Sequence, residues 1–302
     1  MSFATTSTDR VVLAPRGAFS LAASIGFLCG FTPLSYGDQG DDAHQTLRLA
    51  FPVEGDWGAV GVSARQGAGG RVTATIAGPA DAEGVRHQLQ RMLSLDVDAA
   101  SLPDVVSNDD VAADLVRRLR GLRPVCFASP YEAAAWAVLS QRVQMTQAAR
   151  IRARMCHELG AAVEVDGMTI SAFPDPETLR RSTAVRGLAS VKVERLHAVA
   201  DAALDGRLDA ATLRAAGPDQ ALADLQRIPG IGPFGADLVL IRGAGEPDHF
   251  PRTERRLHGA MAEAYGVDAG DLDALELIAA QWRPFRSWIS FLFRACSSMA
   301  MA

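Results

Sequence analysis

One short segment of the chain combines glycine, proline and apolar residues in a pattern that can bind an anion. Residues 225–242 read LQRIPGIGPFGADLVLIR, so Gly230 and Gly232 flank one apolar residue, Ile231. The two glycines allow a tight backbone hairpin that a side chain would block. Pro233 suits the first position of the helix that follows, because its missing N–H has no partner there. The free amides at this helix start form an anion site that suits one DNA phosphate.

The spacing L-x-x-I-P-G-I-G-x-x-x-A is the signature of a helix-hairpin-helix, a motif that holds the DNA backbone without regard to base sequence. The alternative is an ordinary corner between two helices, but the glycine, proline and apolar positions all fit the motif. We therefore predict that the chain binds DNA through Gly230, Ile231, Gly232, Phe234 and Gly235.

The charge of the chain agrees with a DNA surface once the chain is divided in two. Its formal net charge is −5. Residues 1–110 hold 7 arginines and 13 acidic residues, a charge of −6, whereas residues 111–302 hold 23 basic and 22 acidic residues, a charge of +1. The acidity lies in the first third, so we expect any DNA surface in the remainder.

Hydrophobic periodicity changes along the chain. Residues 44–53 and 71–78 alternate apolar and polar residues, as half-buried strands do, and a third strand is expected near 59–65. With an amphipathic helix over 81–95, they predict an α+β domain over residues 1–110. From about residue 111 the strand signal ends. Helices are then expected at 111–121, 130–160, 175–186, 189–205, 208–226, 233–243, 254–266 and 271–296, which predicts a mainly α-helical domain over 111–302 with the helix-hairpin-helix at 225–242.

The composition is that of an ordinary globular protein, with 48% hydrophobic and 22% charged residues. The cysteines form no CxxC pair, which disfavours a zinc site or an iron–sulfur cluster. We expect them to be buried free thiols in a reducing cytoplasm; they are Cys29, Cys126, Cys156 and Cys296.

The apolar stretch Phe19–Phe31 is similar to a signal peptide, but Gly26 and Gly30 interrupt it and no cleavage site follows. It is also too short to span a bilayer. We interpret it as part of the core and expect no membrane partner.

Other segments line up with the hairpin in a known order. Before it, residues 129–160 read SPYEAAAWAVLSQRVQMTQAARIRARMCHELG, and after it, residues 248–261 read DHFPRTERRLHGAM. With GLASVKVERLHAVADAAL (187–204) and WRPFRSWISFLFR (282–294), they resemble the DNA-3-methyladenine glycosylase II family of helix-hairpin-helix base-excision glycosylases. FSLAASIGFLCGFTP (19–33) is similar to the family's N-terminal domain, so the resemblance covers nearly the whole chain.

The resemblance implies a monomeric, monofunctional DNA N-glycosylase that acts in base excision repair. Such an enzyme flips an alkylated purine such as 3-methyladenine out of damaged double-stranded DNA and excises it, leaving an abasic site. Relatives with lyase activity carry a lysine two residues after the second glycine of the hairpin. That position is Phe234 here, and because a Schiff base needs a primary amine, we expect no lyase activity.

The family's catalytic carboxylate follows a Phe-Pro pair, at the start of the helix after the hairpin. In the segment FPRTE (250–254) this position is Glu254, and a shift by one residue would place it on Thr253. A fixed anion beside C1′ stabilises the oxocarbenium-like transition state of glycosidic bond cleavage. Compared with the family's aspartate, glutamate supplies the same charge with a looser position. The alternatives are that Glu254 only complements the helix dipole, or that Asp248 is the acid, although Asp248 resembles a loop or capping residue.

The family's base pocket is matched only in part. In alkylpurine glycosylases, electron-rich rings stack on the flipped, cationic base. Phe234 keeps one such ring, but the corresponding later positions are Leu238, Arg255 and Arg294. We predict a pocket of these four residues and Trp288, although aromatic residues at such spacing more often belong to a core; the other aromatic residues considered are Trp136, Trp282, Phe285 and Phe291.

Further assignments follow from the resemblance. Gln141 and Arg142 occupy the helix end at which the family inserts a side chain into the gap left by the flipped nucleotide, although Arg142 would also suit a solvated surface. Lys192, the only lysine, is expected to be structural or to face a phosphate. The backbone carbonyls of Ile228 and Ile231 are expected to hold a monovalent cation, K⁺ or Na⁺, and no side-chain metal site is expected.

Two other functions stay open at this point. The loss of pocket aromatic residues favours a catalytically weak or silent protein that binds lesions, whereas the carboxylate of Glu254 favours an enzyme. A glycosylase for a different damaged base would share the fold and the mechanism.

Overall fold

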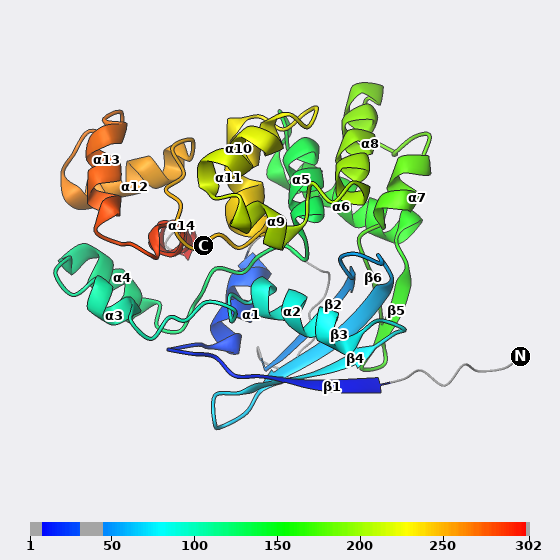
Figure 1. Cartoon of the computed structure of the whole chain (residues 1–302), viewed down its shortest axis with the longest axis horizontal. Helices are drawn as coiled ribbons and strands as arrows, with labels where there is room; N and C mark the ends of the chain where they lie inside the picture. Colours follow the sequence, from blue (N-terminus) through cyan, green and yellow to red (C-terminus); the bar gives the residue numbers. More distant parts are fainter. Residues whose placement is uncertain (1–7, 31–44, 300–302) are drawn as a thin grey trace, which may run out of the picture.

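The computed structural model describes residues 8–30 and 45–299, and an antiparallel sheet forms its first part (Figure 1). The sheet has four strands in the order β1-β4-β3-β2. Three of these strands match the predicted ones, whereas β1 is absent from the prediction because its six residues, TDRVVL, show no clear alternation. Along β4, buried and partly buried residues alternate, as expected for a strand with one covered face. The strands are β1 (Thr8–Leu13), β2 (Thr46–Pro52), β3 (Ala59–Gln66) and β4 (Val72–Ala77).

Two helices accompany this sheet. Helix α1 (Leu21–Gly30) buries Leu21, Ile25 and Leu28, so the described part of the apolar stretch is core, as predicted; Phe31 lies outside the described residues. Helix α2 (Ala82–Met92) matches the predicted amphipathic helix, and the carboxylate of Asp81 caps its first turn.

Helices make up most of the chain after residue 100. Three of the predicted helices are each divided in two by a short break. Residues 140–144 separate α5 from α6, Gly217 separates α9 from α10, and residues 281–285 with Pro284 separate α13 from α14. The helices are α3 (Leu102–Val105), α4 (Asp110–Arg118), α5 (Pro130–Leu139), α6 (Met145–Leu159), α7 (Pro176–Arg181), α8 (Ser190–Leu204), α9 (Ala210–Ala215), α10 (Pro218–Gln226), α11 (Pro233–Leu238), the π-helical turn η2 (Val239–Gly243), α12 (Arg255–Tyr265), α13 (Leu272–Ala280) and α14 (Arg286–Met299).

The expectation that strands end near residue 111 is wrong. Strands β5 (Ala162–Val165) and β6 (Met168–Ser171) form a hairpin between α6 and α7, joined by Asp166 and Gly167, both with positive φ. An Asp-Gly pair between two alternating segments is a strong hairpin signal, which this sequence contains. The hairpin packs on β3 at Gly61, where a Cβ atom would lie only 2.4 Å from the Val165 side chain.

Two hydrophobic cores divide the molecule in a way that positions the functional site. The first joins the inner face of the sheet to the central helices, including α5, α8 and α11. The second joins α4 to α12, α13 and α14, which lie together on the left in Figure 1. Phe27 of α1 packs against both clusters. The helix-hairpin-helix at residues 225–242 belongs to the first core, whereas the segment with Glu254 belongs to the second core.

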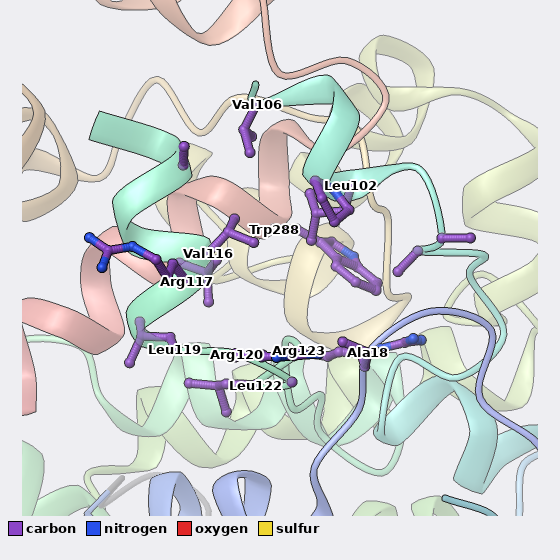
Figure 2. A pocket seen from close by; sticks show the side chains of 16 residues that line it. Ala18, Leu102, Val106, Val116, Arg117, Leu119, Arg120, Leu122, Arg123 and Trp288 are labelled. Atoms are coloured by element: carbon purple, nitrogen blue, oxygen red, sulfur yellow. Dashed lines mark hydrogen bonds between the residues drawn. The ribbon is translucent and has the colours of Figure 1, made fainter. Parts of the chain in front are cut away.

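The buried Arg123 connects segments that lie beside the second core. Its guanidinium donates hydrogen bonds to the backbone carbonyls of Ala18 (3.0 Å) and Ser94 (2.9 Å), and lies 5.3 Å from the Trp288 ring centroid. Burial lowers the pKa of Arg123 to about 10, which leaves it charged at neutral pH. A mostly apolar cavity of about 340 Å³ lies beside this stack, and Figure 2 shows Leu102 and Trp288 in its lining.

The cysteines are free, as predicted, but they are not all buried. Cys29 is exposed, Cys296 is partly exposed, and Cys126 and Cys156 are buried. Burial raises the pKa of the Cys126 and Cys156 thiols, which keeps them protonated and unreactive at neutral pH.

Candidate functional site

A cavity of about 710 Å³ opens where the hairpin helix, α12 and α14 face one another. One stripe of the hairpin helix faces it, with Phe234, Leu238 and Ile241 at helical spacing. One stripe of α14 faces it as well, with Ser287, Ser290, Phe291 and Arg294. Its volume lies in the range of ligand pockets. The remaining lining residues are Phe27, Gly30, Trp136, Ser140, Met145, Asp237, Arg242, Pro251, Thr253, Glu254, Arg255, Arg256 and Leu257.

The hairpin has the predicted backbone geometry. Gly230 has a φ of +94°, and a Cβ atom there would lie 2.7 Å from Cδ of Arg195, so only glycine fits without a shift. The amide of Ile231 donates to the carbonyl of Ile228 at 3.0 Å and closes the turn. Gly232 is extended, and a Cβ atom there would meet no atom within 4 Å. Residue 232 therefore borders open space at the start of α11.

Side chains from the break after α5 and from α8 hold this hairpin in place. The amide group of Gln141 donates to the carbonyl of Gly230, and its oxygen accepts a hydrogen bond from Arg195 at 3.0 Å. Lys192 donates to the carbonyls of Leu139 and Gln141, at 2.8 Å each. Lys192 is thus structural, because it satisfies carbonyls at the end of α5. Desolvation and the charge of Arg195 lower the pKa of Lys192.

Arg142 lies next to this anchored helix end. It is exposed and has a φ of +53°, in the left-handed region that bulky residues rarely adopt. Strained residues of this kind cluster at binding sites. An exposed, strained arginine thus lies just after α5, at the position predicted to enter DNA.

Glu254 lies at the N-terminus of α12 and lines the cavity. Its Oε1 accepts a hydrogen bond from the Arg256 amide at 3.2 Å, so it caps the helix, and the same atom lies 3.9 Å from Nε of Arg294. The capping role and the predicted catalytic role are compatible, because the second carboxylate oxygen has no part in the cap. The charge is therefore held at the cavity wall.

A second carboxylate, which is not among the predicted site residues, also lines the cavity. Asp237 on α11 is only 6% exposed, and its Oδ1 lies 2.8 Å from Nε2 of His249. Its Oδ2 accepts a hydrogen bond from the Thr253 hydroxyl at 2.5 Å. The sequence signal that could have indicated Asp237 is an acidic residue on the same helical stripe as Phe234 and Leu238, in an otherwise apolar helix.

Asp248 has a different environment. Its Oδ1 accepts a hydrogen bond from Nε of Arg286 at 2.8 Å and its Oδ2 accepts one from Nη2 at 3.1 Å. Asp248 is absent from the residues that line the cavity. It therefore joins the loop before α12 to the start of α14, in agreement with a loop or capping residue.

The cavity contains four of the five predicted pocket residues. Phe234, which is 51% exposed, lines it with Leu238, Arg255 and Arg294. The prediction for Trp288 is wrong. On α14 it follows Ser287 by one residue, a rotation of about 100°, which turns it away from the stripe that faces the cavity.

Trp288 lies instead in a small core with Phe285 and Ala99, beneath Arg123. Two aromatic residues regarded as core, Trp136 and Phe291, are buried and also line the cavity. The spacing of aromatic residues in the sequence does not distinguish these two environments.

Arginine is the most frequent charged residue in the cavity wall, and Arg242 packs against two aromatic rings there. Its guanidinium is 5.5 Å from the Phe27 ring centroid and 5.1 Å from that of Phe291, which are favourable cation–π distances. Its Nε donates to the carbonyl of Val125 at 2.9 Å. Burial lowers the pKa of Arg242 to about 10, which leaves it charged at neutral pH. The cavity wall therefore combines several arginines with two carboxylates.

Within the described residues, no group of three or more His, Cys, Asp or Glu side chains is placed to hold a metal ion. None of the helices in residues 8–30 and 45–299 is both long enough and apolar enough to cross a membrane.

Comparisons with known proteins relate this geometry to a family. No family model matches the chain. The probable bifunctional transcriptional activator/DNA repair enzyme AlkA of Mycobacterium tuberculosis is 30% identical over 202 residues, which cover 66% of this chain and 40% of that protein. This chain thus spans less than half the length of that relative. The DNA-3-methyladenine glycosylase of Bacillus subtilis is 24% identical over 215 residues, which cover 69% of this chain and 71% of that protein.

The solved 3-methyladenine DNA glycosylase of Archaeoglobus fulgidus aligns with a TM-score of 0.75 and 24% identity, covering 94% of this chain and 96% of that chain. The chain is thus similar in sequence and fold to 3-methyladenine DNA glycosylases. Further solved structures with this fold include two glycosylases in complex with DNA. The mainly helical fold with a small antiparallel sheet is thus shared with these solved structures.

Proposed function

We propose that the chain is a monofunctional DNA N-glycosylase that flips an alkylated purine, such as 3-methyladenine, out of double-stranded DNA and hydrolyses its glycosidic bond. The observation that carries this proposal is the position of Glu254 in the wall of a 710 Å³ cavity, beside a helix-hairpin-helix. The names and activities of the relatives support it. Repair by base excision and action on damaged DNA as a monomer in the cytoplasm are parts of the same proposal.

The proposed reaction uses two features of this chain. The hairpin amides at the start of α11 hold one phosphate, which places the adjacent nucleotide at the cavity. Cleavage of the N-glycosidic bond sends its electron pair to the leaving base and builds positive charge on the sugar. Glu254 stabilises this charge and orients a water molecule, whose oxygen bonds to C1′ and whose proton passes to the carboxylate. The product is a free base and an abasic site.

The same proposal excludes a lyase step. Phe234 occupies the hairpin position at which lyase-competent relatives carry lysine, and it lines the cavity. Lys192 is held by carbonyls at the end of α5 and is absent from the cavity lining. A Schiff base would need a primary amine at the sugar. The DNA strand should therefore stay intact after base release.

Phe234, Trp136 and Phe291 provide aromatic surface for the flipped base. A stacked ring binds a cationic alkylpurine more strongly than a neutral base. An alkylated purine with a positive charge is also a good leaving group, so a single carboxylate suffices for its release. These two arguments favour alkylated purines as substrates.

One observation favours a second function. Arg294 lies 3.9 Å from Glu254, and Arg242 and Arg255 line the same cavity. Guanidinium groups repel a cationic base and donate hydrogen bonds to the carbonyl groups of a neutral one. A glycosylase for a neutral damaged base is therefore the second candidate. A catalytically silent lesion-binding protein is the third, and it would result if Arg294 neutralised Glu254.

The hairpin carbonyls are a proposed site for a monovalent cation. The Ile228 carbonyl accepts one hydrogen bond from the Ile231 amide, and a carbonyl oxygen has two lone pairs, so this oxygen fits a K⁺ or Na⁺ ion as a further partner. The chemistry that such an ion supplies is positive charge beside the DNA phosphate. The Ile228 and Ile231 carbonyls would hold it, while Gln141 keeps the turn in place.

A base-release assay tests the proposed function. The chain is incubated in excess over methylated duplex DNA, and over duplexes with hypoxanthine, uracil or 8-oxoguanine, and abasic sites are measured by alkaline cleavage. We expect release from methylated DNA. Release only from a neutral base supports the second candidate. Binding of these duplexes without any release supports the third candidate and overturns the enzyme.

A further inference from the structure

Asp237 bonds to two residues of the segment that carries Glu254. His249 lies near the start of this segment and bonds to Oδ1 of Asp237, whereas Thr253 lies near its end and bonds to Oδ2. Both oxygens of one carboxylate are therefore used, on residues four positions apart in sequence. Asp237 itself is fixed by α11, which follows the hairpin directly.

The same segment is also held by two other helices. The backbone of His249 bonds to Ser287 of α14 twice, through its amide at 3.0 Å and its carbonyl at 2.9 Å. His258 of α12 bonds to the carbonyl of Pro251 through Nε2 at 3.0 Å. These contacts join the segment to the second core. The side-chain bonds of this segment to the hairpin helix are the two bonds to Asp237, at the cavity wall.

We propose that Asp237 is a positioning residue, which holds Thr253 and thereby sets the position of the Glu254 carboxylate relative to the hairpin. The inference rests on the proposed function, because it assigns Glu254 the catalytic role. Glutamate has one more rotatable bond than the family's aspartate, and a misplacement of about 1 Å in a catalytic group can cost on the order of 10²-fold in rate. The bonds of Asp237 restrain the backbone from which this longer side chain extends.

Asp237 couples the two functions of the site. The hairpin that receives the phosphate and the Asp237 carboxylate belong to the same short helix. Movement of α11 relative to the segment before α12 would stretch the bonds from Asp237 to His249 and Thr253. The two hydrogen bonds of Asp237 thus restrain the distance between the hairpin and Glu254.

The test compares Asp237→Ala, Thr253→Val and Glu254→Gln with the double variant Asp237→Ala/Glu254→Gln. Single-turnover base release is measured with enzyme in excess, and Kd is measured separately on uncleaved DNA. We expect Asp237→Ala to slow release on the order of 10²-fold with Kd nearly unchanged, because it misplaces a catalytic group. The double variant should be no slower than Glu254→Gln alone. The Thr253→Val variant should lose part of the rate, and Thr253→Ser should recover most of that loss.

Several outcomes overturn the proposal. Release by Asp237→Ala at the parent rate means that the bonds do not position Glu254. A double variant that is slower than Glu254→Gln by the full Asp237→Ala factor means that Asp237 acts on the sugar itself. A loss confined to Kd or to thermal stability means a purely structural role. Thr212→Val, on an exposed threonine of α9, is the matched control for a change of hydroxyl to methyl.

Hydrogen–deuterium exchange separates this inference from the proposed function. Amides of residues 249–256 should exchange faster in Asp237→Ala and Thr253→Val than in the parent or Thr212→Val, with no change around α9. If the parent releases no base from any duplex, the proposed function fails, and the inference about catalysis fails with it. Unchanged exchange in Asp237→Ala overturns the positioning role even when the parent is active.

Discussion

The two sides of the cavity use different parts of the polypeptide. On the hairpin side, the groups proposed to face DNA are backbone amides, and the residue types that matter for them are glycine and proline at Gly230, Gly232 and Pro233. On the side of α12 and α14, the groups are side chains, above all Glu254 and Arg294. A backbone site binds any DNA with the right phosphate spacing. A side-chain site decides which base is released and how fast.

This difference means that DNA binding and chemistry can be separated by substitution. A change on the hairpin side should act on the affinity for all duplexes. A change on the side of α12 should alter the stability of the transition state and hence the rate of base release. Positive charge on the sugar appears only in that state.

The largest expected effect follows from Glu254→Gln. The substitution keeps the size and helix-capping oxygen of residue 254 but removes its charge, so single-turnover release should fall about 10²- to 10³-fold. The Kd for uncleaved damaged DNA should stay nearly the same, because phosphate contacts dominate it. Unchanged release would contradict the catalytic role of Glu254 and direct attention to Asp237.

The next effect concerns the hairpin side alone. In Gly232→Asp, the side chain projects into open space, so the fold should survive, but a carboxylate is placed beside the bound phosphate. We expect affinity to fall roughly tenfold or more at low salt, equally for damaged and undamaged duplexes. Titrations at several salt concentrations measure this, with circular dichroism as the folding control. Parent-like affinity in a folded variant would mean that the hairpin is only a structural corner.

Gly230 should respond differently from Gly232. Its φ of +94° and the 2.7 Å approach to Arg195 make Gly230→Ala a strained substitution. We expect it to lower the free energy of unfolding by about 1–2 kcal/mol, besides weakening DNA binding. Thermal melts of Gly230→Ala and Gly232→Ala provide the comparison. Equal melting temperatures would show that the turn can relax at Gly230.

The hairpin could be predicted from sequence, because its requirements are local. The positive φ of Gly230 and the helix start at Pro233 each depend on neighbours in the chain. Glu254 could be placed in the cavity only through a family resemblance. The role of Asp237 could not be predicted from the family resemblance. It depends on contacts with His249 and Thr253, which lie 12 and 16 residues away in the sequence.

Trp288 and Phe291 illustrate the same limit. Both are large, apolar and buried on one helix, and only the packing of α14 decides that Phe291 faces the cavity while Trp288 faces Arg123. The β5–β6 hairpin was missed for another reason. Its four-residue strands are short, although the Asp166-Gly167 turn was visible in the sequence.

A smaller effect is expected at Arg142, between the two sides. Removing the side chain in Arg142→Ala should weaken binding of lesion-containing DNA roughly three- to tenfold, more than binding of undamaged DNA, because the gap exists only beside a flipped base. Arg142→Gly should lose as much affinity, since it also lacks the side chain, but it should melt at a higher temperature than Arg142→Ala because glycine relieves the strain of a φ of +53°. Equal losses for both duplexes would identify Arg142 as a plain phosphate contact.

The smallest expected effect concerns the lyase reaction, for which we expect no activity. Borohydride traps a Schiff base as a covalent protein–DNA adduct, and such a base requires a primary amine at C1′. Phe234 stands at the lysine position of the hairpin, and Lys192 is the only lysine and is held on carbonyls at the end of α5. No adduct should therefore form during base release, and the product strand should break only after alkali.

Phe234→Lys is the informative counterpart, because it returns an amine to the cavity wall on the hairpin side. An adduct with the parent would show that an amine reaches the sugar from elsewhere, whereas an adduct with Phe234→Lys alone would place C1′ within reach of residue 234 and hence between the two sides of the cavity.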